Sequence, residues 1–195
     1  MNRSLAILQC GALVLLAACG SETSTPAAKT APAPAASAPA IPPPAASPGA
    51  APSPDPAYEA TLAEGIQFQR EGYPRFISSV TGISGREEFG RWSDAGTVIF
   101  TFAEPLPKKF LLSVETTAAY AANAGKPLRV KVGDWAGQAV IGTMPQTAEF
   151  RVASTVAPRT IEFTIAQPTS PKQLGTGDDT RTLGIAFKRL TITTP

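Results

Sequence analysis

Two stretches, Leu128–Val132 (LRVKV) and Thr160–Ile165 (TIEFTI), decide the fold class. In both, apolar residues alternate strictly with polar ones, which is the pattern of a β-strand with one face buried and the other in water. A helix would instead repeat its apolar residues every three to four positions. The sequence therefore predicts a domain built from antiparallel strands.

Further runs of the same kind, with less regular alternation, lie before, between and after these two stretches. They are Ile66–Gln69, Phe76–Val80, Thr97–Phe102, Phe110–Glu115, Gln138–Ile141, Glu149–Ala153 and Leu183–Ile192. Turn-forming Gly, Pro, Asn and Asp separate them. Eight or nine short strands at this spacing predict an antiparallel β-sandwich of jelly-roll or immunoglobulin-like kind. Helix is expected only at residues 56–64 and in one turn near Tyr120–Asn123.

The N-terminal segment has the form of a bacterial lipoprotein signal. An apolar run from Leu5 to Ala18 follows Arg3 and ends in Leu-Ala-Ala-Cys at Cys19. The run is shorter than the roughly 20 residues that cross a bilayer. We predict a signal peptide at residues 1–18 and a lipid on the Cys19 thiol; an ordinary secretory signal with an incidental cysteine is the alternative. Gly20, in place of aspartate, resembles the rule that sorts such proteins to the outer membrane.

Residues 19–57 are dominated by proline and alanine and carry almost no charge. Such a segment cannot bury enough apolar surface to offset the entropy of ordering it, so we predict a disordered, polyproline-like tether. A proline-rich ligand for a signalling domain is a sharper alternative. The predicted organisation is a signal peptide, this lipid-anchored tether, and a β-sandwich at residues 58–195.

Composition excludes several kinds of chemistry. The chain has no histidine, and its two cysteines, Cys10 and Cys19, both lie in the signal region. Ser-His-Asp and Cys-His catalysis, disulfides and nearly all zinc sites are therefore excluded. We expect no metal, no cofactor and no enzymatic activity. The 17 Lys or Arg and 15 Asp or Glu nearly balance without a basic stripe, so a nucleic-acid partner is not expected.

The densest cluster of functional side chains lies in the glycine-rich segment 82–94. It contains Glu88, Arg91 and Trp92 within five residues. An aromatic face flanked by planar donors and acceptors suits a sugar ring, which stacks its CH groups and hydrogen-bonds its hydroxyls. The competing interpretation is structural: Trp92 covers the core, and Arg91 pairs with Glu88 or Asp94 to fix the loop.

Two other segments invite a functional interpretation. Trp135 lies at the tip of a predicted hairpin, where its indole could stack on a ligand or fold back onto the edge of the sandwich. Residues 175–181 resemble a calcium or phosphate loop but have too few ligands for calcium and the wrong glycine spacing for a nucleotide. We expect an interaction between Asp179 and Arg181 that orders the chain before the last strand.

An ordered set of short motifs resembles a known domain family. The motifs are Gly72-Tyr73-Pro74, Val80–Ser84, Glu88–Asp94, Pro105-Leu106-Pro107, Asn123, Val130–Gly133, Asp179–Arg181 and Leu183–Ile185. They are similar to the uncharacterised periplasmic domain at the C-terminus of membrane phosphoglycerol transferases, the enzymes that decorate osmoregulated periplasmic glucans, and on some other envelope glycosyltransferases. The chain lacks the transferase's catalytic domain and membrane helices, so the activity does not carry over.

The resemblance implies an accessory module that works beside envelope glycans. If the shared positions form a site, its residues here are Glu88, Arg91, Trp92, Asn123, Asp179 and Arg181. Trp135 falls outside the shared pattern and is a separate candidate. Our leading hypothesis is a non-catalytic, lipid-anchored glycan-binding domain; the alternative is a module that docks an envelope glycosyltransferase or phosphoglycerol transferase. An enzyme would need Glu88 to face Asp94 or Asp179 across a cleft.

Overall fold

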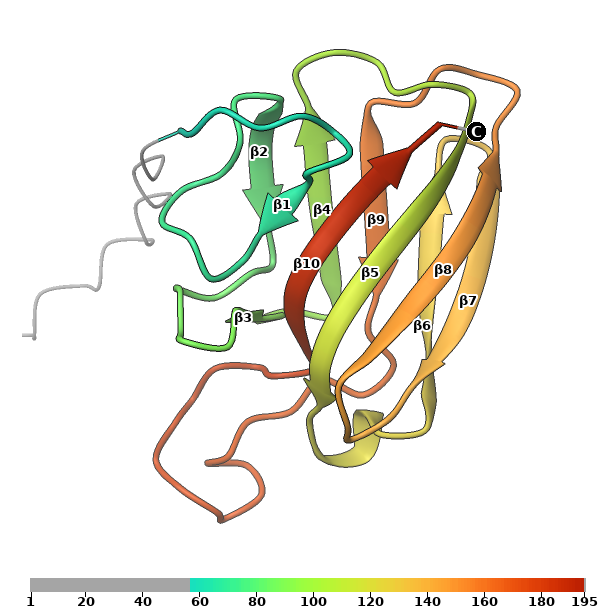
Figure 1. Cartoon of the computed structure of the whole chain (residues 1–195). Coiled ribbons are helices and arrows are strands. Elements are labelled where there is room, and N and C mark those ends of the chain that lie inside the picture. The colour runs from blue at the N-terminus through green and yellow to red at the C-terminus, as the bar shows by residue number, and fades with distance from the viewer. Residues whose placement is uncertain (1–56, 195) are drawn as a thin grey trace, which may run out of the picture. The chain divides into compact units, whose positions relative to one another are not determined.

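The computed structural model describes residues 57–194 (Figure 1). The predicted signal peptide, Cys19 and all of the tether except residue 57 lie outside the described residues. The described chain contains ten strands and one short 3₁₀ helix, η1. Their bounds are β1 Ile66–Gln67, β2 Ile77–Thr81, β3 Arg91–Trp92, β4 Thr97–Phe102, β5 Lys109–Ala119, η1 Ala121–Asn123, β6 Lys126–Val132, β7 Trp135–Ile141, β8 Gln146–Ala153, β9 Thr160–Thr164 and β10 Ile185–Thr193.

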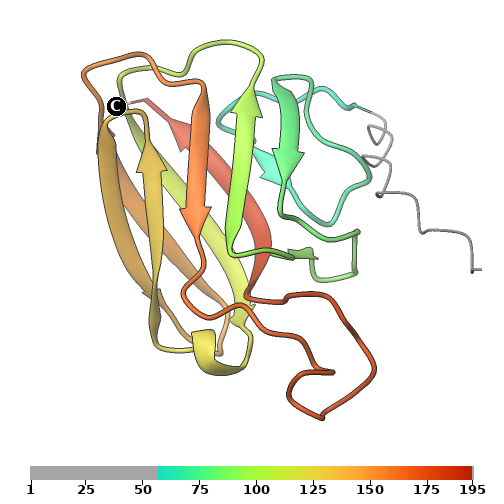
Figure 2. The ribbon, with the colours of Figure 1, turned by 180° about the vertical axis from the view of Figure 1, so that it is seen from behind.

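The strands form two antiparallel sheets that pack face to face (Figures 1 and 2). The first sheet has the order β1-β10-β5-β8, and the short strand β3 also pairs with β10. The second sheet has the order β2-β4-β9-β6-β7. In an immunoglobulin domain the first and last strands belong to different sheets. Here β1 and β10 are neighbours in one sheet, so the strand order differs from that of an immunoglobulin domain.

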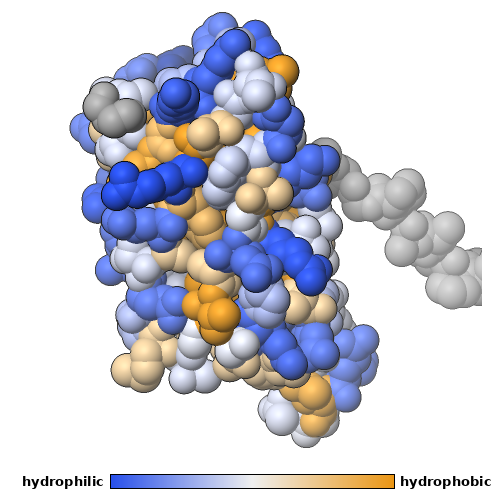
Figure 3. Space-filling model, turned by 90° about the vertical axis from the view of Figure 1, so that its right-hand side faces the viewer, coloured by the Kyte–Doolittle hydropathy of each residue, from blue (hydrophilic) through white to orange (hydrophobic). Residues whose placement is uncertain are grey.

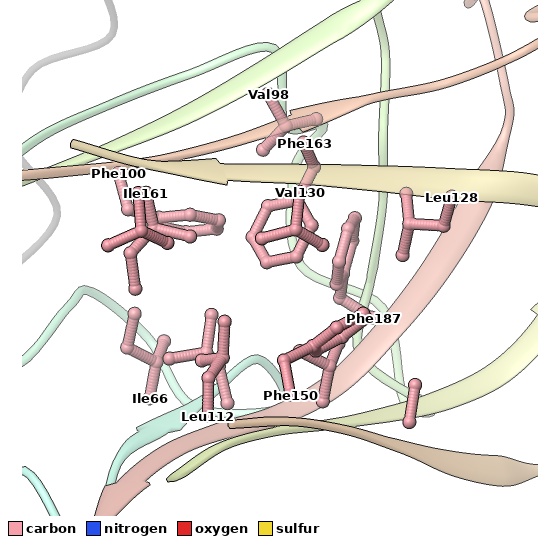
Figure 4. Close-up of a cluster of buried hydrophobic side chains, with 14 of the residues drawn as sticks. Ile66, Val98, Phe100, Leu112, Leu128, Val130, Phe150, Ile161, Phe163 and Phe187 are labelled. Atoms are coloured by element: carbon pink, nitrogen blue, oxygen red, sulfur yellow. The ribbon is translucent and has the colours of Figure 1, made fainter. Parts of the chain in front are cut away.

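The core lies between the sheets and is built from the inward positions of the alternating strands (Figure 4). Val98 and Phe100 in β4 and Ile161 and Phe163 in β9 are fully buried. The rings of Phe163 and Phe187 approach to 5.4 Å between centroids in a T-shaped arrangement that joins the two sheets. Each such side chain contributes about 2 kcal/mol by leaving water.

The fold class predicted from the sequence is confirmed, and each of the nine predicted runs overlaps an observed strand. The two-residue strand β3 was not predicted, because its only signal is a pairing with β10. The predicted turn of helix near Tyr120–Asn123 is confirmed as η1.

The helix predicted at residues 56–64 is wrong for the described residues of that segment. Tyr58 forms a parallel bridge with Pro74, and its backbone N–H donates to the Tyr73 carbonyl at 3.1 Å. Only a turn remains, where Glu64 accepts from the Thr61 N–H at 2.7 Å. The backbone pairing with residues 73–75 outweighed the local helical propensity.

Candidate functional site

Most of the predicted site residues meet at one end of the sandwich, which we call the loop end. It consists of residues 82–94, Tyr120 with η1, and the long connection 166–184 between β9 and β10 (Figure 1). Backbone hydrogen bonds join these segments: Tyr120 N–H donates to the Gly184 carbonyl at 2.7 Å, and Ser93 N–H to the Ile185 carbonyl at 2.8 Å. The loop end is therefore one interlocked unit.

Arg181 is the centre of a charged cluster in the loop end. Its guanidinium donates to both carboxylate oxygens of Asp179, at 2.7 Å from Nη2, and to Glu87 at 2.7 Å from Nη1. These bonds lower the pKa of Asp179 below its usual value and raise that of Arg181, and the side-chain hydrogen bonding from Arg181 to Asp179 is the largest cause in both cases. The predicted Asp179–Arg181 interaction is confirmed. Arg181 also bonds Glu87, which lies 94 positions earlier in the chain.

Glu87, which was not among the predicted site residues, provides a carboxylate of this cluster, whereas the predicted site residue Glu88 does not. The Glu88 side chain is exposed, and its backbone carbonyl accepts from Gln69 Nε2 at 2.9 Å. A tight turn, closed by two hydrogen bonds between the backbones of Glu87 and Gly90, orients the first carboxylate toward Arg181.

Asn123 has a structural role, because its side chain joins two loops. It is 2% exposed, and its amide nitrogen donates to the Tyr120 carbonyl at 3.0 Å and the Gln167 carbonyl at 2.8 Å. Its amide oxygen accepts from the Gln167 N–H at 2.9 Å. The side chain thereby fastens the turn at η1 to the connection after β9, and this use of its polar atoms leaves little for a ligand.

Arg91 is also buried, at 4% exposure, so it does not present its charge to solvent. Its Nη2 donates to the Arg70 carbonyl at 3.2 Å, and its guanidinium carbon lies 4.9 Å from the centroid of the Tyr73 ring. A cation over an aromatic face is favourable and fixes both groups. Arg91 thus joins the loop end to residues 70–73.

Trp92 lies in a cluster of three partly exposed aromatic rings. Its ring centroid is 5.5 Å from that of Phe89 and 5.9 Å from that of Tyr120, both in edge-to-face geometry. Because Trp92 pairs with Ala186 while Arg91 pairs with the core residue Phe187, the indole lies on the outer side of the first sheet. We call Phe89, Trp92 and Tyr120 the aromatic cluster.

The glycines of the loop end are required by close backbone approach. Gly82 has φ +76°, and a Cβ there would overlap the Thr97 carbonyl oxygen. Gly90 has φ +142°, and a Cβ there would overlap the Phe187 carbonyl oxygen. Both conformations strain any residue with a side chain. The backbone of the segment that carries Trp92 is therefore packed closely against β4 and β10.

Trp135 folds back onto the sandwich edge. It opens β7, and its ring packs edge to face on the core residue Phe150 at 6.3 Å between centroids. The ring also lies over Gly137, where a Cβ would overlap the indole. The turn before it is fixed by Asp134, whose carboxylate accepts from the Ser154 hydroxyl at 2.6 Å and the Thr155 N–H at 3.0 Å. These bonds, the one from Ser154 foremost, lower the pKa of Asp134 to about 2.

A shallow groove that was not predicted from the sequence lies on the outer face of the second sheet. Its volume is about 440 Å³, and it lies over β9, β6 and β7. The side chains that line it are Arg129, Lys131, Ala136, Gln138, Glu162 and Thr164. The alternation marked these residues as the solvent face of their strands, but no local motif showed that they gather around one hollow.

The fold and these two regions define a β-sandwich domain with an interlocked loop end and an open polar groove. Comparison with known families then assigns the chain. It belongs to the family described as Domain of unknown function (DUF7024), whose model matches residues 53–194. Among the described residues, no helix is long and apolar enough to cross a membrane.

Curated relatives confirm the predicted resemblance to phosphoglycerol transferases. Phosphoglycerol transferase I of Escherichia fergusonii is 34% identical over an alignment of 128 residues that covers 59% of this chain and 17% of that protein. Phosphoglycerol transferase I of Salmonella paratyphi B is 32% identical over the same length. The chain thus spans about one sixth of the length of the curated relatives it matches. Among solved structures, a mutant of a family 29 carbohydrate-binding module aligns with a TM-score of 0.42 and 12% identity, covering 67% of this chain and 89% of that one.

Proposed function

We propose that this protein is a non-catalytic accessory domain that binds glycan of the bacterial cell envelope. The observation that carries the proposal is the aromatic cluster, in which Trp92 is partly exposed and held between Phe89 and Tyr120. Aromatic rings of this kind bind the CH faces of sugars, and a few polar groups beside them fix the orientation.

The loop end also holds the indole rigidly. Its segments are joined by the Arg181 cluster, by Asn123 and by the close approach at Gly90, so a ligand would meet a platform that is already ordered. Pre-organisation lowers the entropic cost of binding. Arg181 engages three of its five N–H donors within the described chain and has a side chain 36% exposed, which leaves two donors for hydroxyl groups.

The relatives support a role near glycan-modifying enzymes. Two of them are named Phosphoglycerol transferase I, and this chain matches only a small part of each. A domain that is also matched in such an enzyme fits a module that brings protein and envelope glycan together. The predicted lipid on Cys19 and the proline-rich tether would place this module at the outer membrane, within the periplasm.

The decisive experiment uses the fact that the chain has only two tryptophans. In the Trp135→Phe protein, Trp92 is the sole indole, and we expect its fluorescence to shift saturably on titration with unsubstituted periplasmic glucan or peptidoglycan fragments. In the matched Trp92→Leu protein, Trp135 remains and we expect no shift and at least tenfold weaker binding by calorimetry. Equal thermal unfolding of the two variants would show that both are folded. A wild-type protein that binds none of these glycans would refute the proposal.

The alternative function, docking on an envelope glycosyltransferase or phosphoglycerol transferase, draws on a different surface. Val140 is 60% exposed in the edge strand β7, and Met144 is 71% exposed in the following turn. Figure 3 shows this side of the molecule, where hydrophobic patches are interrupted by hydrophilic side chains. Exposed apolar side chains at a sheet edge suit a protein partner. Loss of transferase crosslinking in Val140→Ser with Met144→Ser would support docking, and unchanged glycan binding in that variant would separate the two functions.

A further inference from the structure

The groove over β9, β6 and β7 lies on the sheet opposite to the aromatic cluster, so it is a separate region of the surface. Trp92 pairs with β10 in the first sheet, whereas Arg129 and Lys131 project from β6 in the second. Among the described residues, no other segment crosses this face (Figure 2). A ligand can therefore reach the groove without any rearrangement of the loop end.

The register of the strands places three hydrogen-bonding side chains in one row. Arg129 is opposite Thr164 of β9 on one side and Gln138 of β7 on the other. Neighbouring strands are about 4.8 Å apart, so a hydroxyl, a guanidinium and an amide stand side by side across about 10 Å. The planar fork of arginine holds a phosphate or carboxylate through two parallel hydrogen bonds, and the neighbouring amide and hydroxyl can donate to the same group.

A second row lies one pleat along the strands and has a different character. There Lys131 is opposite Glu162 of β9 and Ala136 of β7. The short side chain of Ala136 leaves space above the sheet on one side of Lys131, and Glu162 lies on the other side. Neighbouring groups of opposite charge suit the hydroxyls of a sugar ring, which both donate and accept hydrogen bonds.

The cations of the groove differ from two cations on the first sheet, Lys188 and Arg189, in having no carboxylate partner among the described residues. On the outer face of the first sheet, Lys188 and Arg189 lie 3.8 Å and 3.7 Å from Glu115. Within the described part of the chain, neither Arg129 nor Lys131 has a carboxylate oxygen within 4 Å or a side-chain hydrogen bond. The side chains of both are exposed, so an anion can bind them without first displacing an internal partner.

We infer that the groove over β9, β6 and β7 binds a glycan that carries an oxyanion, with Arg129, Thr164 and Gln138 holding the anionic group and the Lys131 row holding sugar hydroxyls. The oxyanion is a phosphodiester or a carboxylate, since the arginine fork accepts either. The inference deepens the proposed function by naming a class of glycan, and it rests on that function in taking the ligand to be a saccharide.

The test compares three probes on the full-length protein: periplasmic glucan bearing phosphoglycerol, the same glucan after hydrolysis of its phosphodiesters, and a muropeptide that carries carboxylates. We expect wild type to bind at least one charged probe fivefold or more tightly than the neutral glucan. Arg129→Gln should remove that preference while leaving neutral-glucan binding unchanged. Which charged probe is preferred tells whether the anion is a phosphodiester or a carboxylate.

Two further variants make the test specific. Arg151→Gln in β8 removes the same charge from an exposed position on the first sheet and should leave all three affinities unchanged. Glu162→Gln removes the groove's carboxylate and should tighten binding of the charged probes, because less negative charge then faces them. The preference should also weaken as salt concentration rises.

The inference and the proposed function fail in different ways. If wild type binds neutral and charged glucans equally, or if Arg129→Gln retains the full preference, the groove does not hold an anion, while glycan binding at Trp92 stands. If the Arg151→Gln control weakens charged probes as much as Arg129→Gln does, general surface charge explains the preference and the inference is overturned. If no probe binds wild type, the inference and the proposed function fall together.

Discussion

The loop end and the groove contain the same types of polar side chain, but in the loop end these are bonded within the fold and in the groove they face solvent. In the loop end, Arg181 donates most of its hydrogen bonds to Asp179 and Glu87. The amide nitrogen and the amide oxygen of Asn123 are both hydrogen-bonded within the fold. In the groove, Arg129 and Gln138 face solvent without such partners among the described residues. The difference teaches that a dense cluster of polar residues in the sequence is more readily architecture, and that binding capacity remains where hydrogen-bonding groups are not already used.

The substitution with the largest expected effect on this distinction between the two regions is at Asn123. In Asn123→Ala, the carbonyls of Tyr120 and Gln167 and the Gln167 N–H lose their buried partner, so we expect about 3 kcal/mol lower free energy of unfolding. Urea unfolding followed by circular dichroism measures it. Gln138→Ala in the groove is the matched control and should stay within about 0.5 kcal/mol of wild type. Equal losses in the two variants would contradict the distinction between the regions.

A pair of arginine variants sharpens the comparison for charge. Arg181→Gln breaks an ion cluster whose members are each about one third exposed, so we expect a loss of about 1 kcal/mol in unfolding free energy. The pKa of Asp179 should rise toward its ordinary value, which NMR titration can follow. Arg129→Gln should leave the unfolding free energy unchanged within about 0.5 kcal/mol. A destabilised Arg129→Gln protein with an unaffected Arg181→Gln protein would reverse our assignment.

The smallest expected effect is a dependence of stability on pH through Asp134, in the turn between the groove strands β6 and β7. Hydrogen bonds in the folded state lower its pKa from 3.8 to about 2. The folded state therefore binds this proton less readily than the unfolded chain does. The stabilisation is fully present above pH 3.8 and is lost as the pH falls toward 2.

Asp134→Asn provides the corresponding check. Acid unfolding of this variant should depend less steeply on pH between about 4 and 2 than that of wild type, because the titrating carboxylate is gone. Asp178→Asn, an exposed aspartate without a hydrogen bond from a described residue, is the control and should follow the wild-type curve. Identical acid-unfolding curves for all three proteins would show that the Ser154 and Thr155 bonds do not persist in solution.

Much of the fold was predictable because its signal is local. The alternation at Leu128–Val132 and Thr160–Ile165 follows from the pleat of a strand with one buried face, and it marked β6 and β9 correctly. The Asp179–Arg181 contact spans two residues and was predicted for the same reason. The failed helix before β1 was a local signal as well, but pairing with residues 73–75 decided that segment.

The candidate site was predicted only in part. The sequence located Trp92 in a functional-looking loop, but it could not tell that Glu87 rather than Glu88 reaches Arg181, since a turn that closes at Gly90 determines which carboxylate faces it. Nor did it indicate the groove. The groove's residues come from three strands, and β9 lies beside β6 only because the sheets are assembled in that order.

The sequence alone determined the all-β class, the positions of nine strands and the resemblance to the phosphoglycerol-transferase domain. The reason is that period-two alternation and short ordered motifs are properties of the order of residues along the chain. The tertiary structure alone decided which polar groups are already bonded and which stand open. Asn123 and Arg129 are both polar residues beside apolar ones in the chain, yet one is buried in a tie and the other lines a hollow. The physical reason is that hydrogen-bond satisfaction depends on neighbours across strands, which no spacing along the chain encodes.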